Sequence, residues 1–383
     1  MYLSALYVWG HGSISGRRPS NEDAHIIRDL RGMRQDLTES ITMAGVFDGH
    51  GGPNASAYTQ EKLPLQLTKA RAFPTDVKDA LKQAFLNTDR LYLRDEGHAD
   101  IYSSAGTTAV ACVHYRNVFF FANAGDSRAI IGTSGQGVRQ ITVDHKPNLP
   151  GERARIERAG SCVVDDEGDC PRVAGMLAVS RAIGDAPFKS CGVIADPDIF
   201  AVRDSEIDYV VLACDGLWDV FQNDEVDAVI RHIFKLATRC TDPSLANQIL
   251  TSDLSSGNTS TTRIELLKHA AACLLMSNDP KDKFVSIATS LCEKLAVRDT
   301  ALSFGFANTI AGGFKGFDSC YDECNRTYVT PARKLSPEAI ASYLMRMAMC
   351  LGSDDNITVV LGLGRKLYPK PILAEYDKMV RGR

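Results

Sequence analysis

The chain has 383 residues, 44% of them hydrophobic, and a formal net charge of −4 at pH 7. This length and composition allow a large buried core. The slightly acidic balance argues against a nucleic-acid partner, which would require a basic surface. The apolar runs, such as YVVLAC before Asp215, are shorter than the roughly 20 residues of a membrane helix, so we expect no transmembrane segment.

The predicted elements follow from residue patterning. Runs rich in β-branched and aromatic residues predict strands, and polar and apolar residues at helical spacing predict helices. Runs of strands followed by runs of helices favour an α+β fold with antiparallel sheets covered by helices. In chain order we expect strand Thr42–Phe47, helices Pro53–Ala70 and Val77–Asp95, strands Thr107–His114, Val118–Ala124 and Ala129–Gly132, helix Glu152–Ala159, strand Asp208–Cys214, helices Asn223–Leu236, Asp282–Val297 and Pro337–Leu351, and strand Ile357–Gly362.

The N-terminal segment Tyr2–Trp9 lacks a basic start and a convincing small-residue cleavage site, so we interpret it as a strand and not as a signal peptide. The 11 cysteines are odd in number and spread through apolar runs, which is typical of buried thiols in a reducing compartment. We therefore expect a cytoplasmic or nuclear protein; removal of a targeting segment from the native chain is the alternative. Nothing in the sequence indicates an oligomer, and we expect a monomer.

The segment Cys240–Arg333 differs in composition from the rest of the chain. It contains SSGNTSTTR and a Gly/Phe-rich run, SFGFANTIAGGFKGF, that has no clear periodicity. We interpret it as an insertion, at about 240–333, within a single domain that spans 1–365. The basic tail 366–383 is more typical of a packed or frayed terminus than of a binding arm.

Acidic residues stand at the ends of four strand-like runs: Asp48 after ITMAGVF, Asp126 after FFFANAG, Asp215 after YVVLAC, and Asp355 before NITVVLG. A carboxylate at the lip of a buried strand is costly unless a cation or a hydrogen-bond network pairs it. Because the end of one antiparallel strand lies beside the start of the next, Asp48, Asp215 and Asp355 could converge. One such Asp is more often a turn former, but four together favour a metal site.

Oxygen ligands without a His/Cys cluster select Mg²⁺ or Mn²⁺ over zinc. Two such ions about 4 Å apart lower the pKa of a bridging water, aim it at phosphorus and neutralise the phosphoryl oxygens. Gly49 allows close backbone approach, so its carbonyl could be a ligand, and His50 is placed to protonate a leaving alkoxide. Arg18, upstream of Glu22 and Asp23, could grip a phosphate through its planar fork; a surface charge is the alternative.

Nine motifs occur in a fixed order: RRPSNEDAH (17–25), VFDGHGG (46–52), AGTTAV (105–110), NAGDSRA (123–129), DHKPN (144–148), ERARIERAG (152–160), LAVSRAIGD (177–185), DYVVLACDGLWDV (208–220) and SDDNITVV (353–360). Together they resemble the type 2C, or PPM-type, family of metal-dependent protein serine/threonine phosphatases. The resemblance implies a four-layer fold, in which helices flank a central antiparallel β-sandwich with a two-metal site at one end. It also implies phosphoprotein substrates and two Mg²⁺ or Mn²⁺ ions, with a weaker third.

The resemblance also implies metal-binding roles for the matching residues. Asp48 would bridge two ions, and the Gly49 carbonyl would bind one of them. Asp215 and Asp355 would hold the other ion. Two further acids, Glu22 and Asp23, would order metal-bound waters.

Three further roles are implied by the same resemblance. Arg18 would bind the phosphate and His50 would act as the general acid. Asp126 would form the weaker third metal site with Asp215, and Thr108 lies near that site in the motif order. The SRAIGD motif (180–185) we interpret as structural, and likewise the lone histidines His25 and His145.

The sequence departs from the family pattern in one respect. Asp215 and Asp355 are 140 positions apart, where the family has a few tens, so the insertion must leave and re-enter the domain between helices, as long surface insertions can at small thermodynamic cost. The loop VVDDEGDCPRVAGM occupies the place of the family's variable substrate-facing flap. We expect substrate choice to reside in this loop or in the insertion.

Two alternative functions remain open from the sequence. One is a catalytically weak scaffold or interaction protein that acts through 240–333. The other is a metallophosphatase for a non-protein phosphoester, since a metal and an acid do not by themselves select the substrate. A cysteine-nucleophile phosphatase is rejected: Cys292 and Arg298 have the C-x5-R spacing, but CEKLAVR has no glycine and is typical of a helix interior.

Overall fold

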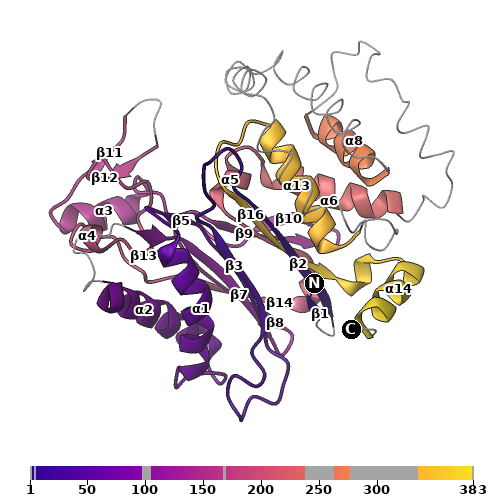
Figure 1. The fold of residues 1–383 in the computed structure, drawn as a ribbon, viewed down its shortest axis with the longest axis horizontal. Helices are drawn as coiled ribbons and strands as arrows, with labels where there is room; N and C mark the ends of the chain where they lie inside the picture. The colour runs from indigo at the N-terminus through magenta and orange to yellow at the C-terminus, as the bar shows by residue number, and fades with distance from the viewer. Residues whose placement is uncertain are drawn as a thin grey trace.

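The computed structural model describes residues 2–3, 6–96, 105–166, 170–237, 263–276 and 335–381. Two antiparallel sheets pack face to face, and helices cover both outer faces (Figure 1). The first sheet has the strand order β1 (Tyr2–Leu3), β2 (Tyr7–Ile14), β16 (Ile357–Gly364), β15 (Ile207–Ala213), β9 (Arg128–Thr133) and β10 (Gly137–Gln140). The second has the order β14 (Asp198–Arg203), β8 (Val118–Ala124), β7 (Ala109–Tyr115), β4 (Thr42–Phe47) and β3 (Ala24–Asp29).

The central strands are buried on both faces because each lies between the opposite sheet and a helical layer. In β15, Val210 and Leu212 belong to the core between the sheets, together with Trp9 of β2. The alternate residues Tyr209 and Val211 face the helical layer. This alternation follows from the two-residue period of a strand, and it explains why β15 is apolar throughout.

Helices form the two outer layers. On the second sheet lie α1 (Asn54–Lys69) and α2 (Val77–Glu96), whose apolar residues share one core with β3, β4 and β7. On the first sheet lie α5 (Asp215–Trp218), α6 (Asn223–Ala237), α8 (Arg263–Met276), α13 (Pro337–Cys350) and α14 (Lys370–Arg381) (Figure 1). The predicted four-layer α+β sandwich is therefore confirmed.

Short elements close one end of the sandwich. A three-stranded sheet joins β13 (Ile183–Gly184), β6 (Gly106–Thr107) and β5 (Gly49–His50), in that order. Beside it, a small apolar cluster that includes Ile156 and Val173 holds a separate group of elements together. This group contains α3 (Pro150–Arg158), β11 (Val163–Val164), β12 (Arg172–Val173) and α4 (Ala186–Lys189). Short 3-10 turns follow β14 and β16, at Asp204–Glu206 and Arg365–Leu367.

The predicted strands Thr42–Phe47 and Val118–Ala124 coincide with β4 and β8, and the other predicted elements from 42 to 237 and from 335 onward agree within two residues at each end. The segment Tyr2–Trp9 is not one strand, because β1 and β2 pair antiparallel with Tyr2 opposite Trp9. The predicted helix Asp282–Val297 lies outside the described residues. Among the described helices, none has the length and apolar character needed to cross a bilayer.

The described part of the proposed insertion is one helix, α8, which packs against α6 through Leu266 and Leu267. Arg263, at the start of α8, donates to Glu225 of α6 at 2.6 Å. In the tail, Tyr376 of α14 is buried in the same core and its ring meets that of Tyr368. The tail thus packs on the domain, while the division of the chain at 240–333 and at 366 stays a prediction.

Candidate metal centre and its pocket

Sheet topology brings the predicted acids together. Asp48 follows the last residue of β4, and Asp215 opens α5 two positions after β15 ends. Since β15 and β16 run antiparallel, with Ala213 opposite Val359, the end of β15 lies beside the segment that precedes β16. The approach is close: a Cβ atom on Gly216 would lie 2.1 Å from the carbonyl oxygen of Asn356.

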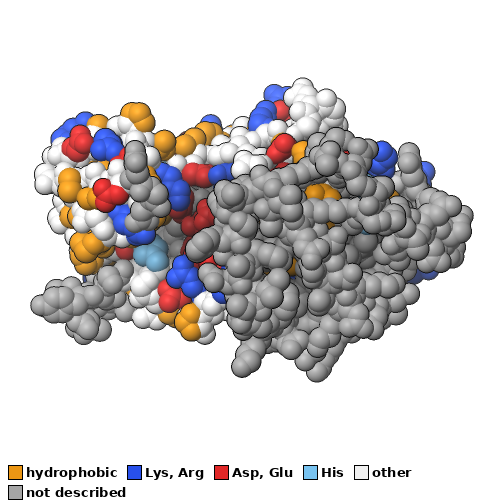
Figure 2. All heavy atoms as spheres, turned by 90° about the horizontal axis from the view of Figure 1, so that it is seen from above, with side chains coloured by type: hydrophobic (Ala, Val, Ile, Leu, Met, Phe, Trp, Pro, Cys, Tyr) orange, Lys and Arg blue, Asp and Glu red, His pale blue; other side chains and the backbone are white. Residues whose placement is uncertain are grey.

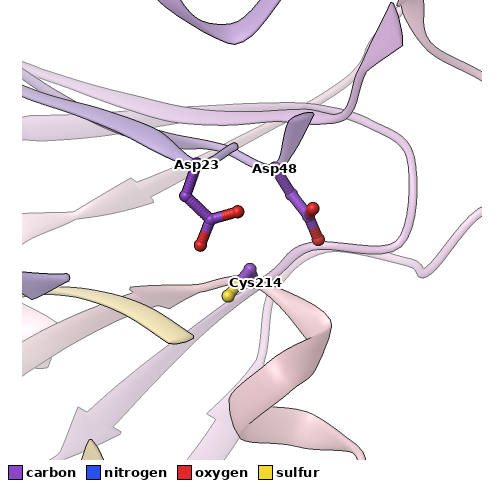
Figure 3. Close-up of side chains that lie close together, drawn as sticks. All are labelled: Asp23, Asp48 and Cys214. Atoms are coloured by element: carbon purple, nitrogen blue, oxygen red, sulfur yellow. The ribbon is translucent and has the colours of Figure 1, made fainter. Parts of the chain in front are cut away.

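Two groups of possible metal ligands share Asp48. One carboxylate oxygen each from Asp48, Asp126 and Asp215 lie within 4.8 Å of one another. In the second group, a carboxylate oxygen of Asp23 and of Asp48 and the Sγ atom of Cys214 meet the same limit, and Figure 3 shows the two carboxylates directed toward the thiol. Both oxygens of Asp23 are buried without a hydrogen-bond partner in the described part of the chain. A bound cation would offset that desolvation, so the donor set fits a divalent ion.

Burial and mutual repulsion act on these carboxyl groups in the same direction. Burial, then the neighbouring Asp215, Asp23 and Asp126, raise the pKa of Asp48 well above its usual value. Burial and Asp126 raise the pKa of Asp215 to about 8, and burial raises the pKa of Asp23 to about 6. A cation that binds here therefore displaces protons, and its affinity should increase with pH.

Lys146 and Asp219 belong to the same cluster, although the sequence analysis assigned them no role. The Lys146 ammonium contacts Oδ2 of Asp126 at 2.5 Å. Burial alone would lower the pKa of Lys146, but Asp126, Asp215 and Asp219 outweigh it and raise the pKa. Asp219 was foreseeable, because it stands four residues after Asp215 in a helical turn and so lies on the same face. Lys146 carried no such local signal.

Asp355 lies outside both ligand groups found among the described residues, but it lines the same pocket. Its Oδ2 accepts a hydrogen bond from Arg18 at 2.8 Å, and its Oδ1 accepts one from the backbone N–H of Asn356. The Asn356 side chain donates to the carbonyls of Ser15 and Ser20. The N-terminal loop that carries Arg18 is thereby fastened to the start of β16.

Glu22 and Gly49 are held against each other at the pocket wall. The amide oxygen of Asn356 accepts from the backbone N–H of Glu22 at 2.8 Å, and the Glu22 carboxylate accepts from Gly52 at 3.0 Å. A Cβ atom on Gly49 would lie 2.2 Å from the Glu22 carbonyl oxygen. Glycine is therefore required at position 49 by close backbone approach.

His50 forms an ion pair that the sequence analysis did not anticipate. Its Nε2 lies 2.9 and 2.8 Å from the two carboxylate oxygens of Asp185. Burial alone would lower the pKa of His50, but Asp185 outweighs it and raises the pKa. The SRAIGD motif, interpreted as purely structural from the sequence, therefore contributes its last residue as a buried partner of His50, which lines the pocket.

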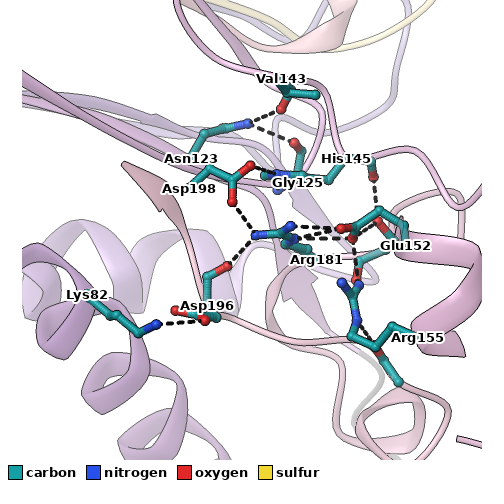
Figure 4. A network of polar contacts seen from close by, with 12 residues as sticks. Lys82, Asn123, Gly125, Val143, His145, Glu152, Arg155, Arg181, Asp196 and Asp198 are labelled. Atoms are coloured by element: carbon teal, nitrogen blue, oxygen red, sulfur yellow. Dashed lines mark hydrogen bonds and ion pairs between the residues drawn. The ribbon is translucent and has the colours of Figure 1, made fainter. Parts of the chain in front are cut away.

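Behind the pocket, a polar network secures the turn that carries Asp126 (Figure 4). His145 Nδ1 accepts from the backbone N–H of Gly125 at 3.1 Å, and Asp198 contacts its Nε2. Arg181 joins Asp198 to Glu152. Burial alone would raise the pKa of Glu152, but hydrogen bonds from Arg155, Arg181 and Ser180 lower it to about 2. The prediction of a structural role for His145 agrees with these contacts, and His25 lies elsewhere, against His11.

An open cavity of about 700 Å³ is lined by nine of the ten predicted site residues, all except Asp23. The predicted flap contributes Cys170, Arg172 and Met176 to the rim. Figure 2 shows acidic side chains gathered in a hollow, with basic and histidine side chains at its edge. The predicted site residues that line the cavity are Arg18, Glu22, Asp48, Gly49, His50, Thr108, Asp126, Asp215 and Asp355. Lys146 and Asp219, which were not predicted, line it as well.

Comparison with known proteins agrees with this site. The family model described as Protein phosphatase 2C matches residues 8–262, about two thirds of the chain, and the chain belongs to this family. It is 43% identical over 226 residues to the "Probable protein phosphatase 2C 55" of Oryza sativa subsp. japonica, covering 58% of this chain and 57% of that relative. It is 37% identical over 228 residues to the "Probable protein phosphatase 2C 69" of Arabidopsis thaliana, covering 59% and 62%. The chain thus spans about three fifths of these relatives' length.

Solved structures share the fold. The match to a sex determining protein of C. elegans has a TM-score of 0.61 at 22% identity and covers 98% of this chain and 68% of that one. The match to a serine-threonine phosphatase 2C from Toxoplasma gondii has a TM-score of 0.57 at 20% identity and covers 95% and 96%. The family is metal-dependent, and the acidic groups described above could bind metal.

Proposed function

We propose that the chain is a protein phosphatase that hydrolyses phosphoserine and phosphothreonine in phosphoprotein substrates, with two Mg²⁺ or Mn²⁺ ions and a weaker third. The observation that carries the proposal is the convergence of Asp48, Asp126 and Asp215 within 4.8 Å in a pocket whose wall also presents Arg18 and His50. Bound divalent cations supply activation of the attacking water and neutralisation of phosphoryl charge.

The carboxylates and one carbonyl would hold the ions. Asp48 would bridge two of them, with the Gly49 carbonyl as a ligand to one. Asp215 and Asp355 would hold the second ion. For this, Arg18 would transfer its hydrogen bond from the Asp355 carboxylate to the phosphate of the substrate. The remaining acids would act around them: Glu22 and Asp23 would orient water, and Asp126 with Asp215 would form the weaker third site.

Arg18 and His50 would act on the substrate itself. The guanidinium of Arg18 is more than half exposed and already engages a carboxylate, so it can bind a phosphate through the same planar donors. His50 would give a proton to the oxygen of serine or threonine as the phosphorus–oxygen bond breaks. Thr108, hydrogen-bonded to Ser127 and to the carbonyl of Asp48, supports the turns that carry Asp48 and Asp126.

The test is phosphate release from a phosphothreonine peptide after chelation, and again after addition of Mg²⁺ or Mn²⁺. The proposal predicts release only with a cation, a loss of about 10²-fold or more in Asp215→Asn, and unchanged release in Cys292→Ser, which controls for a cysteine nucleophile. A folded wild type that stays inert with both cations would contradict the proposal and favour an interaction role. A higher kcat/KM for small phosphometabolites than for phosphopeptides would favour a non-protein phosphoester.

A further inference from the structure

The His50–Asp185 pair joins two segments that are 135 positions apart. The Asp185 side chain is fully buried, while that of His50 is 30% exposed toward the pocket. Both carboxylate oxygens of Asp185 are within hydrogen-bond distance of the same ring nitrogen, Nε2. No described residue forms a hydrogen bond with the other nitrogen, Nδ1. The pair therefore fixes one side of the imidazole and leaves Nδ1 as the nitrogen available to a molecule in the pocket.

A missing side chain makes this contact possible. In the three-stranded sheet, Gly106 lies between its two partners, opposite His50 of β5 on one side and Gly184 of β13 on the other. A Cβ atom on Gly106 would lie 2.2 Å from Oδ2 of Asp185 and 2.5 Å from Nε2 of His50. The Asp185 carboxylate thus crosses the central strand at the one point where the strand carries no side chain.

The backbone around Asp185 is held in an uncommon conformation. Asp185 has a φ of 55°, in the left-handed region that non-glycine residues seldom adopt. Its N–H donates to the carbonyl of Ala105 at 3.0 Å. The N–H of the preceding Gly184 donates to Asp89 of α2 at 2.9 Å, and Lys189 contacts the same carboxylate. Such strain persists only where the surroundings enforce it, and it is frequent at functional sites.

We propose that Asp185 is a positioning residue for His50, which orients the imidazole for proton donation to the leaving oxygen of the substrate. This inference rests on the proposed phosphatase function. In the overall reaction, ROPO₃²⁻ and water give ROH and HPO₄²⁻. As the bond between phosphorus and the leaving oxygen breaks, its electron pair stays on that oxygen, which takes the proton from Nδ1. The water that attacks phosphorus leaves one proton on the phosphate and returns the other to His50.

The proposal makes a prediction about leaving groups. A serine or threonine alkoxide is strongly basic and needs the proton, whereas p-nitrophenolate is a weak base and can leave without it. Loss of a residue that only stabilises the fold should lower hydrolysis of both substrates by the same factor. Loss of Asp185 should instead lower kcat for a phosphothreonine peptide selectively and leave KM unchanged.

The experiment measures kcat and KM for a phosphothreonine peptide and for p-nitrophenyl phosphate, with Mn²⁺, in wild type, Asp185→Asn, His50→Gln and the double variant. The matched control is Asp204→Asn, which removes the carboxylate from a second His–Asp pair, with His114, at 3.1 Å and remote from the pocket. We expect Asp185→Asn to lower kcat about 10²-fold on the peptide and less than about 3-fold on the aryl phosphate. The double variant should match His50→Gln, since the two residues act as one unit.

Three outcomes of the kinetic experiment would overturn the inference. Equal losses on both substrates would make Asp185 a purely structural residue. A double variant far slower than His50→Gln would show that Asp185 acts independently of the histidine. A folded wild type that is inactive on both substrates would refute the phosphatase function along with it. A ¹⁵N NMR spectrum of metal-free protein gives a separate readout: the Nε2-protonated tautomer of His50 should dominate in wild type and be lost in Asp185→Asn, and its persistence there would also overturn the inference.

Discussion

Replacement of Asp215 by Asn should stabilise the protein in the absence of metal. Burial and neighbouring carboxylates raise the pKa of Asp215 from 3.8 to about 8. The folded state therefore binds a proton that the unfolded state releases, so the stability from this group is complete below pH 3.8 and is lost as the pH rises through about 8. At pH 7 the cost is about 3.2 pH units at 1.36 kcal/mol each, or about 4 kcal/mol. Asparagine does not titrate, so the variant does not have this cost.

Urea unfolding followed by tryptophan fluorescence measures this effect, because Trp9 and Trp218 are both buried. In EDTA, Asp215→Asn should exceed wild type by about 4 kcal/mol at pH 7 and match it near pH 4. With Mn²⁺ at about 100 times the dissociation constant, wild type should regain about 2.7 kcal/mol and the variant little. Asp36→Asn, at an exposed carboxylate paired with Arg34, should change the free energy of unfolding only slightly. A variant less stable than wild type at pH 7 in EDTA would refute the reasoning.

Three further substitutions test the surrounding geometry. Gly49→Ala should lower the free energy of unfolding by about 1–3 kcal/mol, measured by thermal melting, because its Cβ would meet the Glu22 carbonyl; an unchanged melting temperature would contradict this. Arg18→Lys should raise KM for a phosphopeptide about 10-fold, as the planar fork is lost, whereas Arg17→Lys, at the charge paired with Asp354, should not. Glu152→Gln should lower the free energy of unfolding by about 3 kcal/mol at pH 7. This difference from wild type should disappear as the pH falls through about 2, where the Glu152 carboxylate becomes protonated. A difference that persists at that pH would show that the ion pairs of Glu152 are not its source.

The sequence predicted the elements whose patterns are strong. The strands β4 and β8 were placed at their observed ends because dense β-branched and aromatic runs mark them, and α2 was found from its helical spacing. Strand β14 (DIFAVR) has four consecutive apolar residues that do not alternate with polar ones, and two-residue strands such as β6 are too short for a periodic signal. The boundary between β1 and β2 was missed because both segments are apolar and no turn motif separates them.

The site was predictable where it depended on motifs and unpredictable where it depended on pairing. Of the three acids expected to converge from the antiparallel arrangement, Asp48 and Asp215 lie together in one ligand group with Asp126, whereas Asp355 lines the same pocket outside that group. Contacts between distant segments, such as His50 with Asp185 and Lys146 with Asp126, leave no local pattern because their spacing is set by the fold. The proposed localisation, the monomeric state and the role of 240–333 stay predictions.

The central claim is that the acids at the strand ends bind the cations on which hydrolysis depends. The most direct test titrates Mn²⁺ into wild type and Asp48→Asn after a chelator has removed their metal. Calorimetry measures Mn²⁺ binding, and a parallel assay measures phosphate release from a phosphothreonine peptide. Our account predicts that release in wild type rises with occupancy of the site, and that Asp48→Asn loses both together while remaining folded. Full hydrolysis by Asp48→Asn, or Mn²⁺ binding in wild type without any hydrolysis, would contradict it.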